Sequence, residues 1–456
     1  MKKVGIGLMH REMALLAIIL LTFWPGSGLG AESPAAAQSP PPAATPGAAP
    51  ELTLDEAVQT ALANHPNVRA AKERIGAQQA VLGQQTAAYY PTVGFNNQYR
   101  TNQSSTSGGA PRASESYSSQ ANFNMILYNF GKREGAVQAA RETLEATSYN
   151  YDTSVDAVVL GVKEAFYGYL QAAAIVKVRQ ETVSSRELLV RQARAFYEVG
   201  TRARIDVVRA ESNLYTAQAD LIAAQNAVKV GWVTLKNAMG LRDLPERPVA
   251  EEAAITAIPY TLDEARDIAY SSRPELKSFE AQRRAQDQSI ATARRGHLPD
   301  LIFDASYGRR HVSDESAPAG GHRDTFPLQP TWSVQLSLNV PIFDGFRTTN
   351  RVEESLRNYH VIRAQEEQQR QQVALDVEQS YLRLVELQER IKANEAAAQA
   401  ARENLDLANG RYQVGVGSII EVTDAQTLYT DAQTTYIRAI YDYRIADAQL
   451  LRAIGR

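Results

Sequence analysis

The stretch LDEA at residues 54–57 decides the fold, because it returns as LDEA at residues 262–265. Pro66 returns as Pro274 at the same offset of 208 residues. After an insertion the register resumes at an offset of 215 residues, at which Tyr197 matches Tyr412. A duplication of this length, with helix-like and strand-like parts in the same order, predicts two equivalent halves in one architecture.

The two copies set the expected domain boundaries. Residues 1–31 combine a charged start, a short apolar run and a small-residue cleavage motif, which predicts a cleavable signal peptide. Residues 32–51 are rich in Pro and Ala and are predicted to be a flexible leader. Repeat 1 is expected at residues 52–240, with a β-hairpin at about 92–128 and a long helical hairpin at about 131–240. An equatorial linker follows at 241–259. Repeat 2 is expected at 260–456, with a β-hairpin at about 300–343 and a long helical hairpin at about 345–455.

Composition excludes several classes of protein. The net charge is −3 and no long basic run occurs, so nucleic acid is not an expected partner. The chain has no cysteine, which excludes disulfides, thiolate metal sites and a lipidated N-terminal cysteine. It also has no Gly-rich phosphate loop, zinc-protease motif or nucleophile elbow. We therefore expect no enzyme, no catalytic residues, no cofactor and no metal, and we do not expect a lipoprotein.

Four segments have the period of two that is typical of β-strands. The clearest runs from Trp332 to Val340, where apolar residues alternate with Ser, Gln and Asn. Its length and its single apolar face suit a tilted transmembrane strand, although a soluble sheet packed on a core has the same pattern. Beyond the N-terminus no apolar run is long enough for a transmembrane helix, so a membrane would have to be crossed by strands.

The segments after the strands have the heptad repeat of a coiled coil. In the first copy one heptad position holds Val207, Leu214, Leu221, Val228 and Leu235, and the position three residues later always holds Ala or Gly. The second copy repeats this pattern from Val422 to Leu450. Small residues at every second seam position allow helices to approach closely.

Oligomerisation follows from the number of strands. Two hairpins are too few to close a water-filled barrel, and open sheet edges in lipid would leave backbone groups without hydrogen bonds. Three chains with four strands each would supply twelve. The expected fold class is therefore α+β, mainly α: a trimeric β-barrel continued by a long α-helical coiled-coil tunnel, with an internal duplication.

Several motifs together make the chain similar to the TolC-like outer-membrane efflux and secretion channels. The motifs that carry the resemblance are LDEA at 54–57, NHP at 64–66, GHLP at 296–299, LYNFG at 127–131, PIFDG at 341–345, YEVGT at 197–201 leading into Asp206, and the repeat-two counterpart YQVGV at 412–416. The resemblance implies a homotrimer in the outer membrane of a Gram-negative bacterium, with its barrel in the lipid bilayer and its tunnel in the periplasm. It also implies two partners, a periplasmic adaptor and an inner-membrane pump or ABC exporter.

The resemblance further implies roles for residues at the periplasmic tip. It assigns the constriction and the adaptor contact to two turns, formed by Val199, Gly200, Thr201, Val414, Gly415 and Val416. Glu421 and Asp424 match inward-facing acidic positions, so a three-fold axis would collect six carboxylates that favour cations. Glu421 also fits a capping box that begins with Ser418 and does no more than start a helix.

Asp206 and Tyr412 match positions that hold the tip closed in this family. Asp206 is equally explained as a first-turn acid that complements the helix dipole. Gly417 stands where the family has a gate arginine, whereas Arg202 and Arg204 lie in the first-repeat turn. We therefore expect a tip network whose contacts differ from those of the family.

The expected function is the outer-membrane channel of a tripartite efflux system, a passive exit duct for small molecules. A channel for type I protein secretion is the alternative within the same family. A periplasmic coiled-coil scaffold without a pore is the alternative from another class. The sequence does not specify the cargo, the adaptor or the pump.

Overall fold

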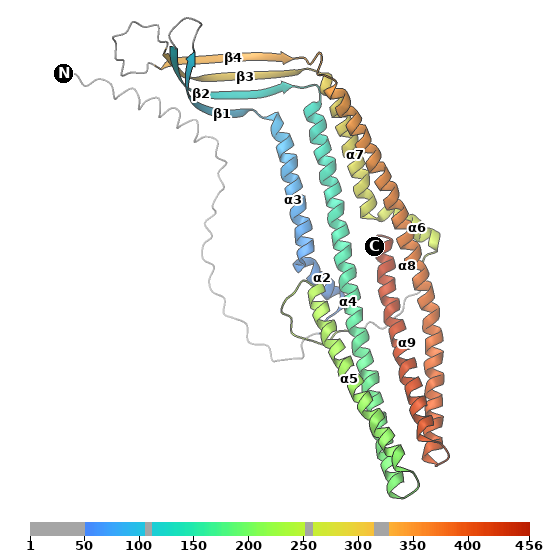
Figure 1. Cartoon of the computed structure of the whole chain (residues 1–456). Helices are drawn as coiled ribbons and strands as arrows, with labels where there is room; N and C mark the ends of the chain where they lie inside the picture. Colours follow the sequence, from blue (N-terminus) through green and yellow to red (C-terminus); the bar gives the residue numbers. More distant parts are fainter. Residues whose placement is uncertain (1–50, 105–111, 251–258, 314–327) are drawn as a thin grey trace, which may run out of the picture. The chain divides into compact units, whose positions relative to one another are not determined.

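The helices and strands occur as two sets with the same order (Figure 1). The computed structural model describes residues 51–104, 112–250, 259–313 and 328–456, so the predicted signal peptide and nearly all of the predicted leader lie outside the described residues. The first set is α2 (Leu54–Asn64), α3 (Pro66–Thr86), the 3₁₀ turn η1 (Ala87–Tyr89), β1 (Thr92–Ser104), β2 (Arg112–Tyr128), α4 (Lys132–Glu198) and α5 (Arg204–Ala238). The second set is α6 (Leu262–Ser272), α7 (Pro274–Arg294), the 3₁₀ turn η2 (Arg295–His297), β3 (Asp300–Ser313), β4 (Gln329–Asn339), α8 (Arg347–Gln413) and α9 (Ile419–Ala453).

Matching helices have equal lengths in the two sets. The long helices α4 and α8 each have 67 residues, and their partners α5 and α9 each have 35. At a rise of about 1.5 Å per residue, each long helix spans about 100 Å. The duplication of the sequence is thus a duplication of structure.

Local capping explains where the short helices begin. The Thr53 hydroxyl accepts a hydrogen bond from the backbone N–H of Glu56 at 3.2 Å and starts α2. At the matching position Thr261 forms a full capping box with Glu264, with distances of 3.4 and 2.8 Å. Pro66 and Pro274 then occupy the first turn of α3 and α7, where a missing N–H costs nothing.

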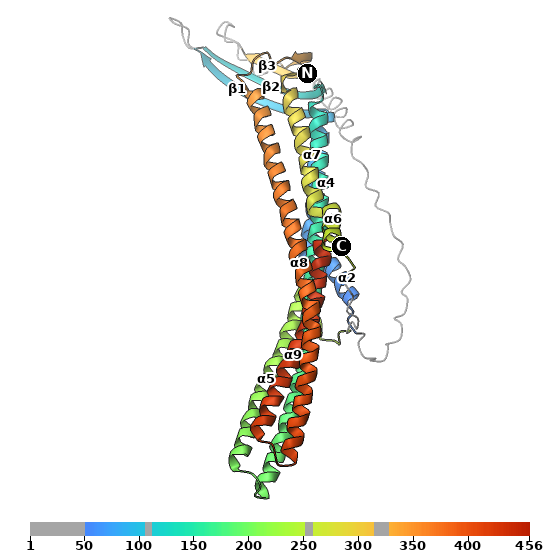
Figure 2. The same ribbon diagram turned by 90° about the vertical axis from the view of Figure 1, so that its right-hand side faces the viewer.

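The heptad residues form the seam between paired helices. α4 packs along α5, and α8 packs along α9, while α3 and α7 lie beside the parts of the long helices that are nearer the sheet (Figure 1 and Figure 2). In α9 the large heptad residues Val422, Tyr443 and Leu450 are buried. Ala425, Ala439, Ala446 and Ala453, each three residues after a large one, are buried as well. Close helix contact at the small residues is what the pattern predicts.

The two helical hairpins meet at the end opposite the sheet. There Leu189 and Ala193 of α4 belong to one apolar cluster with Leu405, Tyr412 and Val422 of the second hairpin. Both views place the α4–α5 and α8–α9 turns at this end (Figure 1 and Figure 2). The two repeats therefore share a core at their tips.

All four strands form one antiparallel sheet in the order β1-β2-β3-β4. Tyr99 pairs with Tyr117, Ala121 with Tyr307, and Tyr307 with Trp332. The β2–β3 pairing joins the two repeats into one sheet, and β1 and β4 are its edges.

Among the residues that the structure describes, no helix is both long and apolar enough to cross a membrane.

Candidate functional site

The turns at the helix tips have one local geometry in both repeats. Gly200 and Gly415 adopt positive φ angles of 77° and 85°, which residues with a Cβ rarely adopt. The N–H of Thr201 returns to the carbonyl of Phe196 at 2.9 Å, and the N–H of Val416 does the same toward Arg411 at 3.0 Å. This is the Schellman helix ending, and it leaves Val199, Val414 and Val416 exposed at the tip.

Arg202 connects the two turns. Its guanidinium donates hydrogen bonds to the carbonyl oxygens of Gly415 at 2.9 Å and Gly417 at 2.6 Å. It also lies over the Tyr412 ring, with 5.4 Å between Cζ and the ring centroid. A cation of repeat 1 thus binds two backbone carbonyl oxygens of the repeat-2 turn, between the end of α8 and the start of α9.

Tyr412 is the buried centre of the tip. It is only 1% exposed, and its ring packs edge-to-face on Phe196 at 5.6 Å. Burial raises the pKa of its hydroxyl, the negative charge of Asp206 raises it further, and Arg202 acts in the opposite sense. Among the described residues no group forms a hydrogen bond with this hydroxyl. The charge of Asp206 in repeat 1 thus acts on the hydroxyl of Tyr412 in repeat 2.

Glu421 has a partner that the sequence analysis did not identify. Ser418 caps α9 by accepting a hydrogen bond from the backbone N–H of Glu421 at 3.2 Å. The Glu421 carboxylate forms an ion pair of 3.0 Å with Arg411 of α8, so only the Ser418 half of the predicted capping box is present. Both side chains are exposed, and the charge of Glu421 is partly compensated.

Asp424 faces another cation that the sequence analysis missed. Arg186 of α4 is only 6% exposed and donates hydrogen bonds to Thr427 Oγ1 at 3.0 Å and to the Thr423 carbonyl at 3.4 Å. Burial lowers the pKa of its guanidinium, and the negative charge of Asp424 acts in the opposite sense. One sequence signal was present, since Arg186 shares its helix face with Leu189 and Ala193 at helical spacing.

Gly417 lies at a close backbone approach in the α8–α9 turn. A Cβ at this position would lie 2.9 Å from the Tyr412 backbone N and 3.0 Å from the Arg411 carbonyl carbon. The Gly417 N–H donates to the Arg411 carbonyl at 2.8 Å, which holds the turn tight. The turn therefore has a glycine where two backbone segments come close, and Arg202 of the other repeat donates to the carbonyl of that glycine.

The sheet presents two different faces. Val93, Phe95, Tyr99, Tyr307, Trp332, Val334, Leu336 and Leu338 point to one face, and each is at least 60% exposed. The other face carries polar pairs such as Asn124 with Asp304 at 2.6 Å and Ser306 with Ser333 at 2.8 Å. An exposed apolar surface of this extent marks an interaction with a membrane or another protein.

Exposed aromatic residues surround the junctions between the strands and the helices. They are Tyr89, Tyr90, Tyr128, Phe130, Phe343 and Phe346. Phe130 and Phe346 have positive φ angles of 55° and 65°, so each junction turns sharply before its long helix starts. Aromatic residues are enriched where a protein passes from lipid to water.

Comparison with known proteins identifies the family. The model of the outer membrane efflux protein family matches residues 57–241 and 265–456. The chain belongs to the outer membrane efflux protein family. This confirms the resemblance that the sequence motifs indicate.

Two relatives and one solved structure illustrate the position of the chain in the efflux protein family. The outer membrane protein TolC of Vibrio cholerae is 26% identical over 409 residues, covering 88% of this chain and 90% of the relative. The toluene efflux pump outer membrane protein TtgC of Pseudomonas putida is 24% identical over 411 residues, covering 88% and 82%. The crystal structure of a membrane protein from Pseudomonas aeruginosa has a TM-score of 0.74 at 23% identity, covering 88% of this chain and 93% of that one. The fold class predicted from the sequence is thereby confirmed.

Proposed function

We propose that this protein is the outer-membrane duct of a tripartite efflux system and works as a homotrimer. Membership of the outer membrane efflux protein family and the similarity to TtgC, the outer membrane protein of a toluene efflux pump, support this proposal. Type I protein secretion is the alternative within the family, and no contact among the described residues favours it.

One observation carries the proposal: a sheet with an exposed apolar face is continuous with helices about 100 Å long. In lipid the backbone groups along the edge strands β1 and β4 need partners. Pairing β4 of one chain with β1 of the next satisfies them, and three chains close a barrel of twelve strands. The apolar face then contacts the lipid bilayer, the polar face lines the lumen, and the aromatic residues at the junctions lie at the membrane boundary.

The helix tips are the proposed contact for the other components. Val199, Val414 and Val416 are exposed apolar side chains on turns fixed by Gly200 and Gly415. Thr201 is held by its hydroxyl, which donates to the Phe196 carbonyl at 2.9 Å. A rigid apolar tip suits docking of a periplasmic adaptor, which would bring an inner-membrane pump or ABC exporter into line with the duct.

The closed tip is proposed to depend on contacts within each chain. Arg202 joins the two turns, and Asp206 lies near the Tyr412 hydroxyl. Glu421 and Asp424 of the three chains would form an acidic ring of six carboxylates that selects cations. Arg411 and Arg186 would reduce the net negative charge of this ring. The ring would therefore favour cations less than six free carboxylates would.

The proposed location is the outer membrane of a Gram-negative bacterium. The relatives named above are outer membrane proteins of Vibrio cholerae and Pseudomonas putida. The signal peptide predicted at residues 1–31 would account for export to this location.

Two measurements test this proposal. Purified protein added to a planar lipid bilayer should give discrete conductance steps; a lack of conductance from intact trimers would favour the scaffold. Deletion of the gene should then raise intracellular accumulation of a fluorescent efflux substrate while the secreted proteins stay unchanged. Loss of secreted proteins with unchanged accumulation would identify a secretion channel instead.

A further inference from the structure

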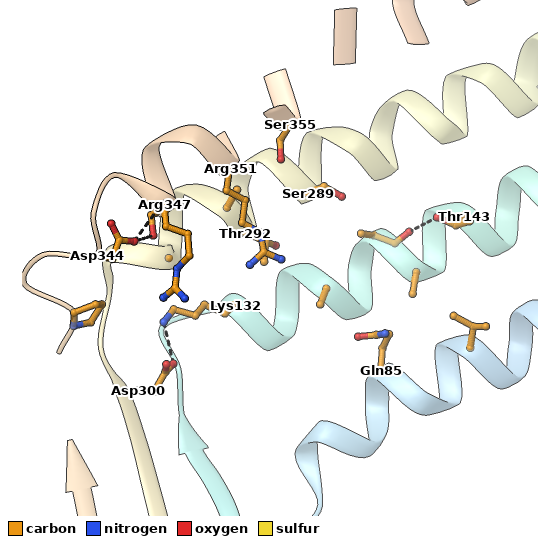
Figure 3. A pocket seen from close by; sticks show the side chains of 18 of the residues that line it. Gln85, Lys132, Thr143, Ser289, Thr292, Asp300, Asp344, Arg347, Arg351 and Ser355 are labelled. Atoms are coloured by element: carbon orange, nitrogen blue, oxygen red, sulfur yellow. Dashed lines mark hydrogen bonds and ion pairs between the residues drawn. The ribbon is translucent and has the colours of Figure 1, made fainter. Parts of the chain in front are cut away.

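A cleft with several cations lies where the sheet joins the long helices. Its volume is about 790 Å³, and its walls come from α3, α4, α7 and α8 (Figure 3). Lys132 approaches it from the start of α4, whereas Arg347 and Arg351 extend into it from the first turns of α8. None of these residues takes part in the contacts that Arg202 and Tyr412 make at the helix tips.

The cleft opens on the polar side of the sheet. Asp300 of β3 and Asn339 of β4 line it and are paired directly in the strand register. Their apolar neighbours Leu301 and Leu338 point to the opposite face, because side chains alternate along a strand. If the proposed duct is correct, the cleft therefore faces the lumen, just below the membrane.

The two carboxylates in the cleft are already engaged. Asp300 pairs with Lys132 at 3.0 Å, and the Lys132 ammonium also donates to the Leu298 carbonyl at 2.7 Å. Asp344 accepts hydrogen bonds from the N–H of Thr348 at 2.9 Å and from its hydroxyl at 2.5 Å. The hydrogen bond from the Thr348 hydroxyl lowers its pKa most, and the charges of Arg347 and His297 lower it less.

Arg347 and Arg351 keep their donors available. Neither guanidinium has a carboxylate oxygen within 4.0 Å among the described residues, although many other exposed arginines of the long helices do, such as Arg357 with Glu353 at 2.7 Å. Arg347 and Arg351 are four residues apart and so lie on the same face of α8. Figure 3 shows both directed toward α4, with Lys132 opposite Arg347. Two adjacent guanidinium groups match the geometry of carboxylate and phosphate oxygens.

We propose that this cleft, in the wall of the duct, is a binding site for the oxyanion of a small molecule, a carboxylate or a phosphate. It deepens the proposed function by naming a class of cargo, and the lumenal orientation rests on that function. Three chains would place three such binding sites around the three-fold axis of the trimer. Anionic cargo that has passed the weakly acidic tip would be held here before it leaves through the barrel.

The absence of cysteine allows a direct measurement of the potential in the cleft. A single cysteine introduced as Ala136→Cys, a half-buried position in the cleft wall, is labelled with an anionic and with a cationic methanethiosulfonate reagent in detergent-solubilised protein. Arg347→Gln with Arg351→Gln should lower the ratio of the anionic to the cationic rate about threefold or more, because charges within a Debye length act oppositely on the two reagents. Arg390→Gln, on the same helix but about 60 Å from Arg351 at a rise of about 1.5 Å per residue, is the matched control and should leave the ratio unchanged.

Occupancy is tested by protection from the anionic reagent. Potassium phosphate should slow the labelling of Ala136→Cys more than potassium chloride at equal ionic strength, and this difference should vanish in the double arginine variant. An unchanged ratio in the double variant, or equal protection in both backgrounds, would overturn the proposal. Protection seen only in nanodiscs that contain phosphatidylglycerol, and not with phosphate, would assign the site to a lipid headgroup and also overturn it. The labelling does not depend on conductance. A failure of the proposed duct function would therefore be detected separately, in the planar bilayer measurement.

Discussion

Arg202 donates a hydrogen bond of 2.6 Å to the carbonyl oxygen of Gly417, and this contact ties the turn of one repeat to the turn of the other. Both residues lie in turns outside the helices, and they occupy equivalent positions of the two copies, since 215 residues separate them. The two copies differ where they touch, so the tip is asymmetric within each chain.

Arg202→Ala should loosen the tip. The loss of two charged hydrogen bonds at a partly exposed site is expected to cost about 1–2 kcal/mol and to raise the frequency or size of openings in planar bilayers. Arg204→Ala removes the same charge two residues away and should behave like the unmodified protein. Equal behaviour of the two variants would show that the Arg202 contact does not hold the turns together.

Gly417→Ala should destabilise the α8–α9 turn. The added Cβ would meet backbone atoms at 2.9–3.0 Å, and the expected cost is about 1–3 kcal/mol. Gly410→Ala is the control, because a Cβ there meets nothing within 4 Å and should stabilise the helix by about 0.5–1 kcal/mol. Thermal unfolding and protease cleavage at the turn measure both effects. A stable Gly417→Ala variant would contradict the close contact.

The acidic ring predicts two opposite changes in ion selectivity. Glu421→Gln with Asp424→Asn should reduce cation selectivity, measured as the reversal potential under a salt gradient. Arg411→Gln should increase it, because it releases the Glu421 carboxylate from its 3.0 Å ion pair. A shift of the same sign in both variants would exclude the ring as the selective element.

The two faces of the sheet predict different responses to charge. Leu336→Lys places an ammonium on the exposed apolar face and should cost about 2–4 kcal/mol if that face contacts lipid. Gln335→Lys places the same charge on the polar face, where Asp304 lies opposite in the register, and should cost far less. The yield of folded trimer in liposomes compares them. Similar yields would argue against contact between the apolar face and lipid.

Asp447 predicts a pH dependence of stability. Burial raises the pKa of its carboxyl, and Lys163 and Arg444 lower it less. Because the native state binds this proton more tightly than the unfolded state, the contribution of Asp447 to stability is full below its ordinary pKa and is lost as the pH rises through the raised native value. Asp447→Asn should therefore flatten the pH dependence and leave stability at neutral pH equal or higher. A fall in thermal stability at neutral pH would contradict this sign.

The repeat, the period of two and the heptads were sufficient to predict the fold. Alternation from Trp332 to Leu338 indicates a strand with one apolar face, and the Ala425 series indicates a close helix seam, since both follow from local spacing. The same reasoning could pair Asp206 with Tyr412 only through the family resemblance. The sequence did not predict the partners of Glu421 and Asp424. Arg411 and Arg186 lie on other helices, so no residue spacing within one helix indicates these pairs.

The sequence by itself determined the duplicated order of helices and strands, the helix endings at Gly200 and Gly415, and the absence of cysteine chemistry. Those features depend on neighbouring residues along the chain, and neighbours are what a sequence displays. Only the tertiary structure decided that Arg202 crosses to Gly417, and that Arg347 and Arg351 meet Lys132 in one cleft. Such contacts are set by the packing of helices far apart in the chain, where a shift of one helical turn would bring other side chains together.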